Sequence, residues 1–255
     1  MDRFDLYELA VQSPPHVVAL LRAIHGRTPR VLAEDFSGTA AVSRAWVTAI
    51  EGGRAIAVDR DGEALARARG HAAMHVIESD VRELPSSALA RADVVFAGNF
   101  SIGELHERRE LVDYLRRSRE RLNPHGVFVC DTYGGASAYR IGAVTRTHVG
   151  PDATRVLYTW EQRRADPTTA RVENALHFRV ERSGEIVHEI TDAFVYRWRL
   201  WSVPELSDAL AEAGFARSEV HADLPEPRVN ARAIAIDGAA LPESFIVCVA
   251  GRVDA

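Results

Sequence analysis

The stretch VLAEDFSGTAA, residues 31–41, carries the main information about the fold. An apolar run ends in two acidic residues, a turn with a single glycine follows at Gly38, and a helical sequence begins at once. A strand, a glycine turn and a helix in this order are typical of the ligand-binding edge of an α/β sheet. A dinucleotide turn requires G-x-G-x-x-G, whereas this turn has only Gly38 and the small residues Ala40 and Ala41. We therefore do not expect this turn to hold a pyrophosphate.

Short apolar runs alternate with helical patterns on both sides of this stretch. Runs rich in Val, Ile and Ala predict strands at residues 30–34, 54–59, 74–80, 92–98 and 126–133. Apolar residues three or four positions apart predict helices at residues 38–50, 62–72 and 104–122. Strands alternating with helices and joined by right-handed crossovers predict an α/β fold with a doubly wound, mostly parallel sheet.

The pattern changes after about residue 140. Turn sequences ADPTT and RSGE separate three stretches rich in Val, Tyr, Trp and Phe, so residues 153–201 are predicted to form an inserted antiparallel three-stranded β-meander. Residues 202–255 are predicted to contain a helix and two strands that complete a seven-stranded Rossmann-like sheet. We expect one domain over residues 1–255, with a helical segment at 1–29 and a cofactor-binding half at 30–140.

Composition excludes several classes of function. The 31 basic residues are all arginine, so Schiff-base chemistry on lysine and a lysine-bearing phosphate loop are absent. A net charge of -5 with scattered arginines argues against nucleic acid as a partner. No apolar run reaches membrane-spanning length and no signal peptide is recognisable, so we expect no membrane association and a cytoplasmic location. Cys130 and Cys248 lie in apolar runs and are interpreted as buried residues, and no metal site is predicted.

The acidic residues around the turn favour a different cofactor. Glu34 and Asp35 at the end of the first strand suit a ligand with an ammonium group and a positive sulfur. Asp59 ends the second predicted strand 21 residues after Gly38, the position from which a carboxylate accepts both ribose hydroxyls. Asp80 follows after another 21 residues, where a carboxylate can accept from an adenine amino group. Adenosine joined to an amino acid is S-adenosyl-L-methionine.

Several motifs carry a family resemblance over roughly residues 30–135. VLAEDFSGTAAVSRAWV, AIAVDRD, IESDVRELP and DVVFAGNFSIGEL resemble the successive cofactor motifs of class I S-adenosylmethionine-dependent methyltransferases. The later sequence WSVPELSDALAEAGF resembles the approach to the sixth strand in that superfamily. EDFSGTA, NFS, YTWEQ and YRWRLW together resemble a bacterial subgroup of it. The resemblance implies transfer of a methyl group to an O or N atom of a small molecule by in-line displacement.

Carried over by position, the resemblance assigns Glu34 to the methionine amino group and the turn to the methionine moiety. Asp59 is expected to bind the ribose, Arg60 to flank the adenine, and Asp80 with Val81 to contact the adenine edge. The remaining expected cofactor contacts are Phe36, Gly38 and Thr39 in the turn and Asn99 and Phe100 after the fourth strand. The superfamily commonly has G-x-G-x-G here, so Phe36 and Ala40 are departures from its pattern.

Candidates for catalysis and substrate binding are less specific. His106 and Tyr133 follow the fourth and fifth strands and are candidate catalytic residues, His106 because imidazole titrates near neutral pH. Candidate substrate contacts are Tyr7, Tyr158, Arg179 and Arg197. Phe194, Tyr196 and Trp198 share one face of a strand, so the insertion is interpreted as a lid over the substrate, as packing against the main sheet or as a homodimer contact.

Other functions remain open at this stage. One alternative is a module that binds S-adenosylmethionine or S-adenosylhomocysteine without catalysis, and another is a methyltransferase acting on a macromolecule. Cytosine-5 enzymes share an F-x-G turn, but they need a nucleophilic cysteine after the fourth strand, where this chain has AGNFS. A dinucleotide-dependent oxidoreductase is third, and the missing glycines argue against it.

Overall fold

The computed structural model describes residues 1–84, 91–150, 154–222 and 241–254. The chain divides into two compact units. The larger unit comprises Pro14–Gly135 and Trp201–Ala255, and the smaller unit comprises Met1–Ser13 and Ala136–Leu200.

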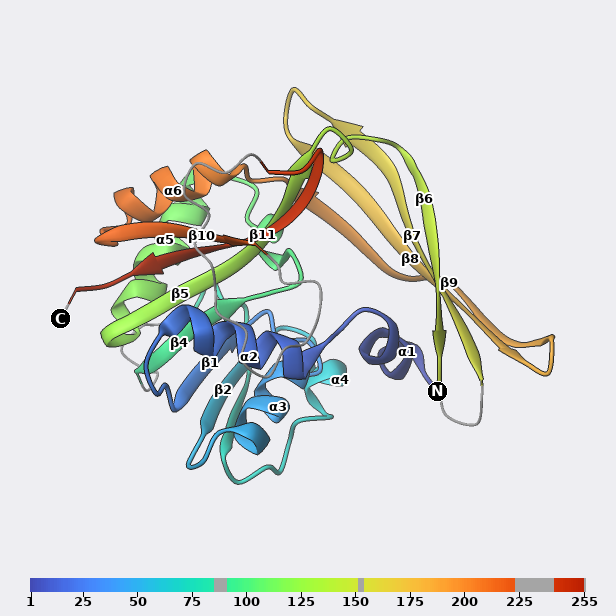
Figure 1. The fold of residues 1–255 in the computed structure, drawn as a ribbon, viewed down its shortest axis with the longest axis horizontal. Helices are drawn as coiled ribbons and strands as arrows, with labels where there is room; N and C mark the ends of the chain where they lie inside the picture. The colour runs from blue at the N-terminus through green and yellow to red at the C-terminus, as the bar shows by residue number, and fades with distance from the viewer. Residues whose placement is uncertain (85–90, 151–153, 223–240, 255) are drawn as a thin grey trace. The chain divides into compact units, whose positions relative to one another are not determined.

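The larger unit is built on a seven-stranded sheet with the order β10-β11-β5-β4-β1-β2-β3 (Figure 1). The pairs of β1 with β2 and β4, β2 with β3, and β4 with β5 are parallel, while β11 is antiparallel to both β5 and β10. The mostly parallel seven-stranded sheet predicted from the sequence is therefore confirmed. The strands are β1 (Val31–Asp35), β2 (Arg54–Asp59), β3 (Met74–Glu78), β4 (Ala92–Ala97), β5 (Leu122–Gly135), β10 (Arg217–Ala222) and β11 (Ser244–Arg252).

Helices cover both faces of this sheet. On one face, α2 (Pro14–His25) and α3 (Ala41–Ala49) pack a core that includes Leu21 and Trp46. On the other face, α5 (Arg108–Glu120) and α6 (Val203–Glu212) pack a core that includes Leu115 and Leu210. The two cysteines lie in opposite cores, Cys130 with α5 and Cys248 with α2, and both are buried outside any disulfide, as interpreted from the sequence.

One predicted helix is much shorter than expected. The expectation was a helix at residues 62–72, but α4 spans only Gly62–Leu65. After Leu65 the amide groups of Arg67 and Ala68 donate to carbonyls three residues earlier. These bonds to the carbonyl three residues earlier are typical of a 3₁₀ turn, so the α-helix ends after a single turn.

The smaller unit contains the predicted antiparallel insertion with one more strand than expected. Its sheet has the order β6-β7-β8-β9, formed by β6 (Gly142–Val149), β7 (Arg155–Asp166), β8 (Arg171–Arg182) and β9 (Glu185–Arg199). The extra strand is β6, which lies entirely before residue 153, where the predicted meander begins. Nearly every β6 residue is exposed, so its sequence lacks the buried apolar alternation that identifies a strand, and backbone pairing with β7 holds it.

The aromatic face predicted for the insertion exists, and it packs within the smaller unit. The rings of Phe194 and Tyr196, and those of Tyr196 and Trp198, stack along β9. Helix α1 (Arg3–Ala10) packs on this face through Phe4 and Tyr7, whose rings lie 5.8 and 5.0 Å from that of Phe194. The N-terminal residues thus supply one layer of this unit, a long-range contact that local sequence patterns do not reveal.

Candidate functional site

The turn after β1 has the backbone shape of a glycine-rich loop with fewer glycines. Phe36, Gly38 and Ala40 have φ angles of 54°, 54° and 55°, so all three lie in the left-handed region. A residue with a Cβ pays roughly 1–2 kcal/mol in this region, whereas glycine does not. Phe36 and Ala40 therefore adopt at a cost the conformation that glycine supplies in a G-x-G-x-G turn.

The ligand side of this turn is open. A Cβ added at Gly38 would meet no heavy atom within 4 Å. On either side of Gly38, the hydroxyls of Ser37 and Thr39 are buried and have no hydrogen-bond partner among the described residues. Buried polar atoms normally have a partner. The clearance and the two unsatisfied hydroxyls fit a small polar ligand lying against the turn.

Asp59, at the end of β2, holds the turn in place. Its carboxylate accepts the Gly38 amide N–H at 2.7 Å and the Asp61 amide N–H at 2.8 Å. An ionised carboxylate has about four acceptor positions, so further donors can bind it. The structure thus brings the predicted turn and the predicted ribose-binding carboxylate into direct contact.

Glu34 is buried beneath the turn, on the face that carries α3. One carboxylate oxygen accepts from the amide and the hydroxyl of Ser43, at 2.7 and 2.6 Å. Burial raises the pKa of Glu34 to about 7, and the two Ser43 hydrogen bonds only partly oppose this. A group of this kind gains or loses its proton near neutral pH according to the charge placed beside it.

This raised pKa predicts that Glu34 makes stability fall as pH rises. In the unfolded chain Glu34 has its ordinary pKa of 4.5, so the folded protein holds this proton more tightly than the unfolded chain does. The resulting contribution to the free energy of unfolding is complete below pH 4.5 and is lost as pH rises through about 7. Between pH 5 and pH 8 we expect the free energy of unfolding of wild type to fall by about 2–3 kcal/mol more than that of Glu34→Gln, which has no carboxyl group at this position. Urea unfolding of both proteins at the two pH values measures this, and parallel pH profiles would contradict it.

Asp35 does not face the cofactor side, contrary to the expectation that both acidic residues do. Successive side chains of a strand point to opposite faces, and Asp35 points into the core beneath α5. Its carboxylate accepts two hydrogen bonds from Arg121, at 2.9 and 3.0 Å, and one from the Tyr114 hydroxyl at 2.9 Å. The Phe36 ring packs on that of Tyr114, at 5.9 Å between centroids. Asp35 therefore belongs to a buried network that supports the turn from below.

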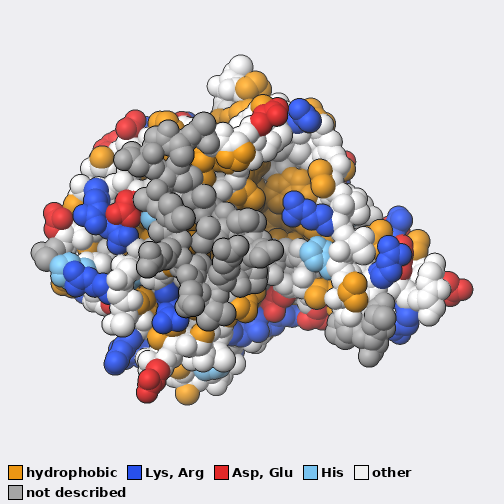
Figure 2. Space-filling view, in the orientation of Figure 1, with side chains coloured by type: hydrophobic (Ala, Val, Ile, Leu, Met, Phe, Trp, Pro, Cys, Tyr) orange, Lys and Arg blue, Asp and Glu red, His pale blue; other side chains and the backbone are white. Residues whose placement is uncertain are grey.

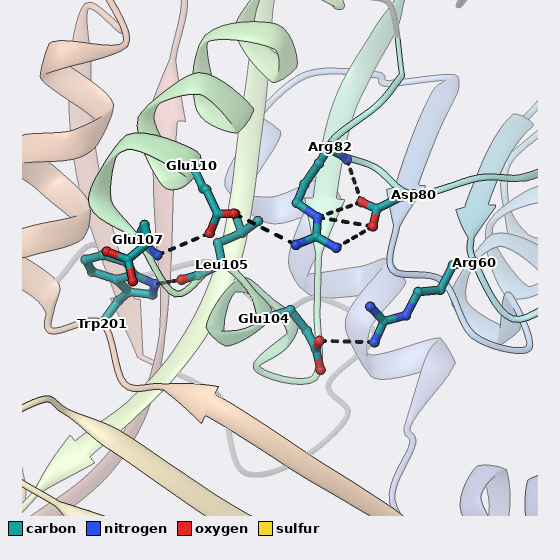
Figure 3. A network of polar contacts seen from close by, with 8 residues as sticks. All are labelled: Arg60, Asp80, Arg82, Glu104, Leu105, Glu107, Glu110 and Trp201. Atoms are coloured by element: carbon teal, nitrogen blue, oxygen red, sulfur yellow. Dashed lines mark hydrogen bonds and ion pairs between the residues drawn. The ribbon is translucent and has the colours of Figure 1, made fainter.

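Two ion pairs connect the segments after β2, β3 and β4 (Figure 3). Arg60 pairs with Glu104 at 3.2 Å, which links the end of β2 to the segment after β4. Arg82 donates three side-chain hydrogen bonds to Asp80 and lies 3.9 Å from Glu110 on α5. These hydrogen bonds lower the pKa of Asp80. The sequence did not indicate Glu104 as the partner of Arg60 or Arg82 as the partner of Asp80. An arginine two residues after Asp80 was nevertheless visible in it.

The segment after β4 brings together other predicted residues. Phe100 packs edge-on against Tyr133 of β5, with centroids 4.9 Å apart. His106 is half-buried and lies after η2 (Ser101–Glu104) and just before Glu107, the N-cap of α5, rather than on a helix. Val81 is buried in the core that contains α5, so its side chain is not available to a ligand.

The four predicted substrate residues all belong to the smaller unit, where each has a partner. Tyr7 packs on Phe194. Tyr158 is 6% exposed and stacks on Phe178, so its predicted role in substrate contact gives way to one in the core of this unit. Arg179 is paired with Glu189 on β9, and Arg197 with Glu173 on β8, at 2.8 and 3.0 Å.

Across residues 1–84, 91–150, 154–222 and 241–254, no group of three or more His, Cys, Asp or Glu side chains is placed to hold a metal ion. Within the same ranges, no helix is both long and apolar enough to cross a membrane. On the face drawn in Figure 2, the described arginines are interspersed with acidic side chains.

Comparisons with known proteins support the fold. No protein-family model matches this chain, and no curated protein matches it by sequence. The solved structure of DesVI from Streptomyces venezuelae has a TM-score of 0.73 at 20% identity, over 99% of this chain and 97% of that one. The sugar N-methyltransferase KedS8 from a Streptoalloteichus species has a TM-score of 0.69 at 18% identity, over 99% and 93% of the two chains.

A third solved structure is that of CalS10 from Micromonospora echinaspora, an amino pentose methyltransferase bound to S-adenosylmethionine. It has a TM-score of 0.70 at 17% identity, over 98% of this chain and 96% of that one. These matches run over nearly the full length of both chains. They show that this chain has the Rossmann-like methyltransferase fold with a β insertion.

Proposed function

We propose that this protein is an S-adenosylmethionine-dependent methyltransferase that moves a methyl group to an O or N atom of a small molecule by in-line displacement. The observation that carries the proposal is the contact of Asp59 with Gly38 in a turn that is left-handed at Phe36, Gly38 and Ala40. A G-x-G-x-G cofactor turn has glycine at the three corresponding positions, and glycine adopts positive φ angles without a steric cost. The full-length similarity to methyltransferase structures supports the same conclusion.

The residues present fit this cofactor, which would supply an electrophilic methyl group. Glu34 would lie near the methionine ammonium, whose positive charge would favour the ionised carboxylate of a group with a pKa of about 7. The open space over Gly38 and the hydroxyls of Ser37 and Thr39 would receive the methionine moiety. Asp59 would accept from the ribose hydroxyls while it keeps the Gly38 amide.

The adenine contacts are proposed at the ends of β2 and β3. Arg60 would flank the ring, and Asp80 with the Val81 amide would bind its edge. Asp80 already receives three hydrogen bonds from the Arg82 side chain, so a base amino group would share that carboxylate with Arg82. Asn99 and Phe100 would lie near the transferred methyl group.

Catalysis is proposed to depend mainly on proximity. Holding an acceptor in line with a methyl group in a dry site can contribute about 7–11 kcal/mol in favourable cases. A base is needed only for an acceptor that starts protonated, and His106 and Tyr133 are the candidates for it. Tyr133 has the stronger support, because its ring contacts Phe100 of the proposed cofactor site.

For the acceptor, we propose a sugar-like small molecule with a free amino or hydroxyl group. The support is the description of two similar structures as a sugar N-methyltransferase and an amino pentose methyltransferase. A homodimer through the insertion and a cytoplasmic location remain predictions. Exposed Ile141, Val144 and Val149 at and beside the edge strand β6 support the former.

The test is incubation of the protein with methyl-labelled S-adenosylmethionine, a bacterial metabolite extract and a panel of amino sugars. We expect label in a small molecule and none without the protein. Label found only in RNA or protein would overturn the acceptor class and favour a macromolecular methyltransferase. Cofactor binding by calorimetry without any labelled product would instead favour a non-catalytic binding module.

A further inference from the structure

The backbone that follows β4 has an unusual conformation. Asn99 and Phe100 have φ angles of 55° and 62°, which places two consecutive residues with side chains in the left-handed region. Asparagine tolerates this region, but a bulky aromatic residue rarely adopts it. Such strain persists only where the surrounding structure holds it, and it is concentrated at functional sites.

Asp131 on the neighbouring strand β5 holds this turn. One of its carboxylate oxygens accepts the Asn99 amide N–H at 3.0 Å, and the other accepts the Phe100 amide N–H at 2.7 Å. Hydrogen bonds to an ionised carboxylate are stronger than those between neutral groups. Each oxygen therefore binds one of the two strained residues.

Strand β5 also contacts the aromatic ring of Phe100. Tyr133 lies two residues after Asp131, so the two side chains share one face of β5. Its ring packs edge-on against Phe100. Strand β5 therefore holds both parts of Phe100: Asp131 binds its backbone amide, and Tyr133 packs against its ring.

We propose that Asp131 is a positioning residue, which acts through Asn99 and Phe100 to shape the methyl-proximal end of the cofactor site. This inference rests on the proposed function, because it needs the Asn99–Phe100 turn to lie beside the cofactor. Asp131 donates no proton and touches no reacting atom. Its carboxylate keeps the turn in a conformation that the chain would otherwise leave.

The chain offers a matched control. Asp93 on β4 also accepts two backbone N–H groups, those of Arg30 and Val31 at 2.7 and 2.9 Å. These bonds lie at the amino end of β1, the end of that strand opposite the Gly38 turn. Asp93→Ala therefore removes a comparable carboxylate without disturbing the proposed site.

The experiment combines calorimetric titration with S-adenosylmethionine and hydrogen–deuterium exchange of the full chain. Asp131→Ala is expected to speed exchange in peptides covering residues 98–104 at least tenfold and to weaken cofactor binding about tenfold. Asp131→Asn keeps one acceptor oxygen, so it should fold like wild type and give intermediate values for both. Asp93→Ala should leave both values at those of wild type.

Two results in the Asp131 variants would overturn the inference alone. One is wild-type cofactor affinity in both Asp131 variants, and the other is unchanged exchange over residues 98–104. Equal weakening in Asp93→Ala would also overturn it, because the effect would then be general destabilisation. If wild type itself does not bind S-adenosylmethionine, the proposed function fails first and the inference falls with it.

Discussion

Arg121→Met is expected to destabilise the protein by about 3–5 kcal/mol, the usual result of removing one partner from a buried ion pair. The Arg121 and Asp35 side chains are 3% and 0% exposed and are joined by two hydrogen bonds. Without Arg121, the Asp35 carboxylate would keep the hydrogen bond from the Tyr114 hydroxyl and lose the two from the guanidinium. A buried and poorly compensated charge then raises the free energy of the folded state.

Urea unfolding at pH 7 measures this effect, and helix α5, of which Arg121 is the C-cap, supplies a control. Arg116 pairs with Asp113 at the surface of α5, where both side chains are 40% exposed or more, so Arg116→Met should change stability by less than about 1 kcal/mol. The double variant Asp35→Leu/Arg121→Met should be more stable than Arg121→Met, because no charge remains buried. A loss below about 1 kcal/mol in Arg121→Met would show that the pair is unimportant for stability.

Asp59→Ala is expected to weaken S-adenosylmethionine binding at least about 100-fold from a micromolar-range affinity. The substitution removes the acceptor proposed for the ribose hydroxyls and the anchor of the Gly38 amide. Hydrogen bonds to charged groups contribute about 1.5–3 kcal/mol each, and 1.4 kcal/mol corresponds to a factor of ten in affinity.

Calorimetry of both proteins tests this prediction, with Asp61→Ala as the matched control. Asp61 lies two residues away and also accepts two backbone N–H groups, those of Glu63 and Ala64 at the start of α4. Its replacement should lower stability slightly and leave cofactor affinity within about threefold of wild type. Unchanged binding in Asp59→Ala would remove the main support for the cofactor assignment.

Much of the cofactor half could be predicted because its signals are local. Alternating apolar runs and helical periodicity predict β1 to β5, and the turn after β1 and the aspartate that ends β2 identify Gly38 and Asp59 as candidate ligand residues. The contact between them follows from parallel pairing of β1 with β2, which the alternation itself implies.

Other features depended on contacts between distant parts of the chain. Glu34 and Asp35 were both expected to face the cofactor, although strand alternation puts them on opposite sides. No local pattern indicates that Arg121, 86 residues later in the chain, neutralises Asp35. Asp131 was visible as one acidic residue in an apolar strand, with no sign that it would hold the turn after β4. The exposed strand β6 could not be recognised because backbone pairing, rather than burial, maintains it.

The sequence by itself determined the order of strands and helices in the seven-stranded unit, and it indicated the turn and the two aspartates proposed to bind the cofactor, because periodicity and strand-end residues act locally. Only the tertiary structure decided how that turn is supported. Phe36 and Ala40 take a left-handed backbone that residues with side chains adopt at a cost, with the Phe36 ring packed on Tyr114 above the buried Asp35–Arg121 pair. Strain of this kind is balanced by packing, and packing is set by residues brought together from distant segments of the chain.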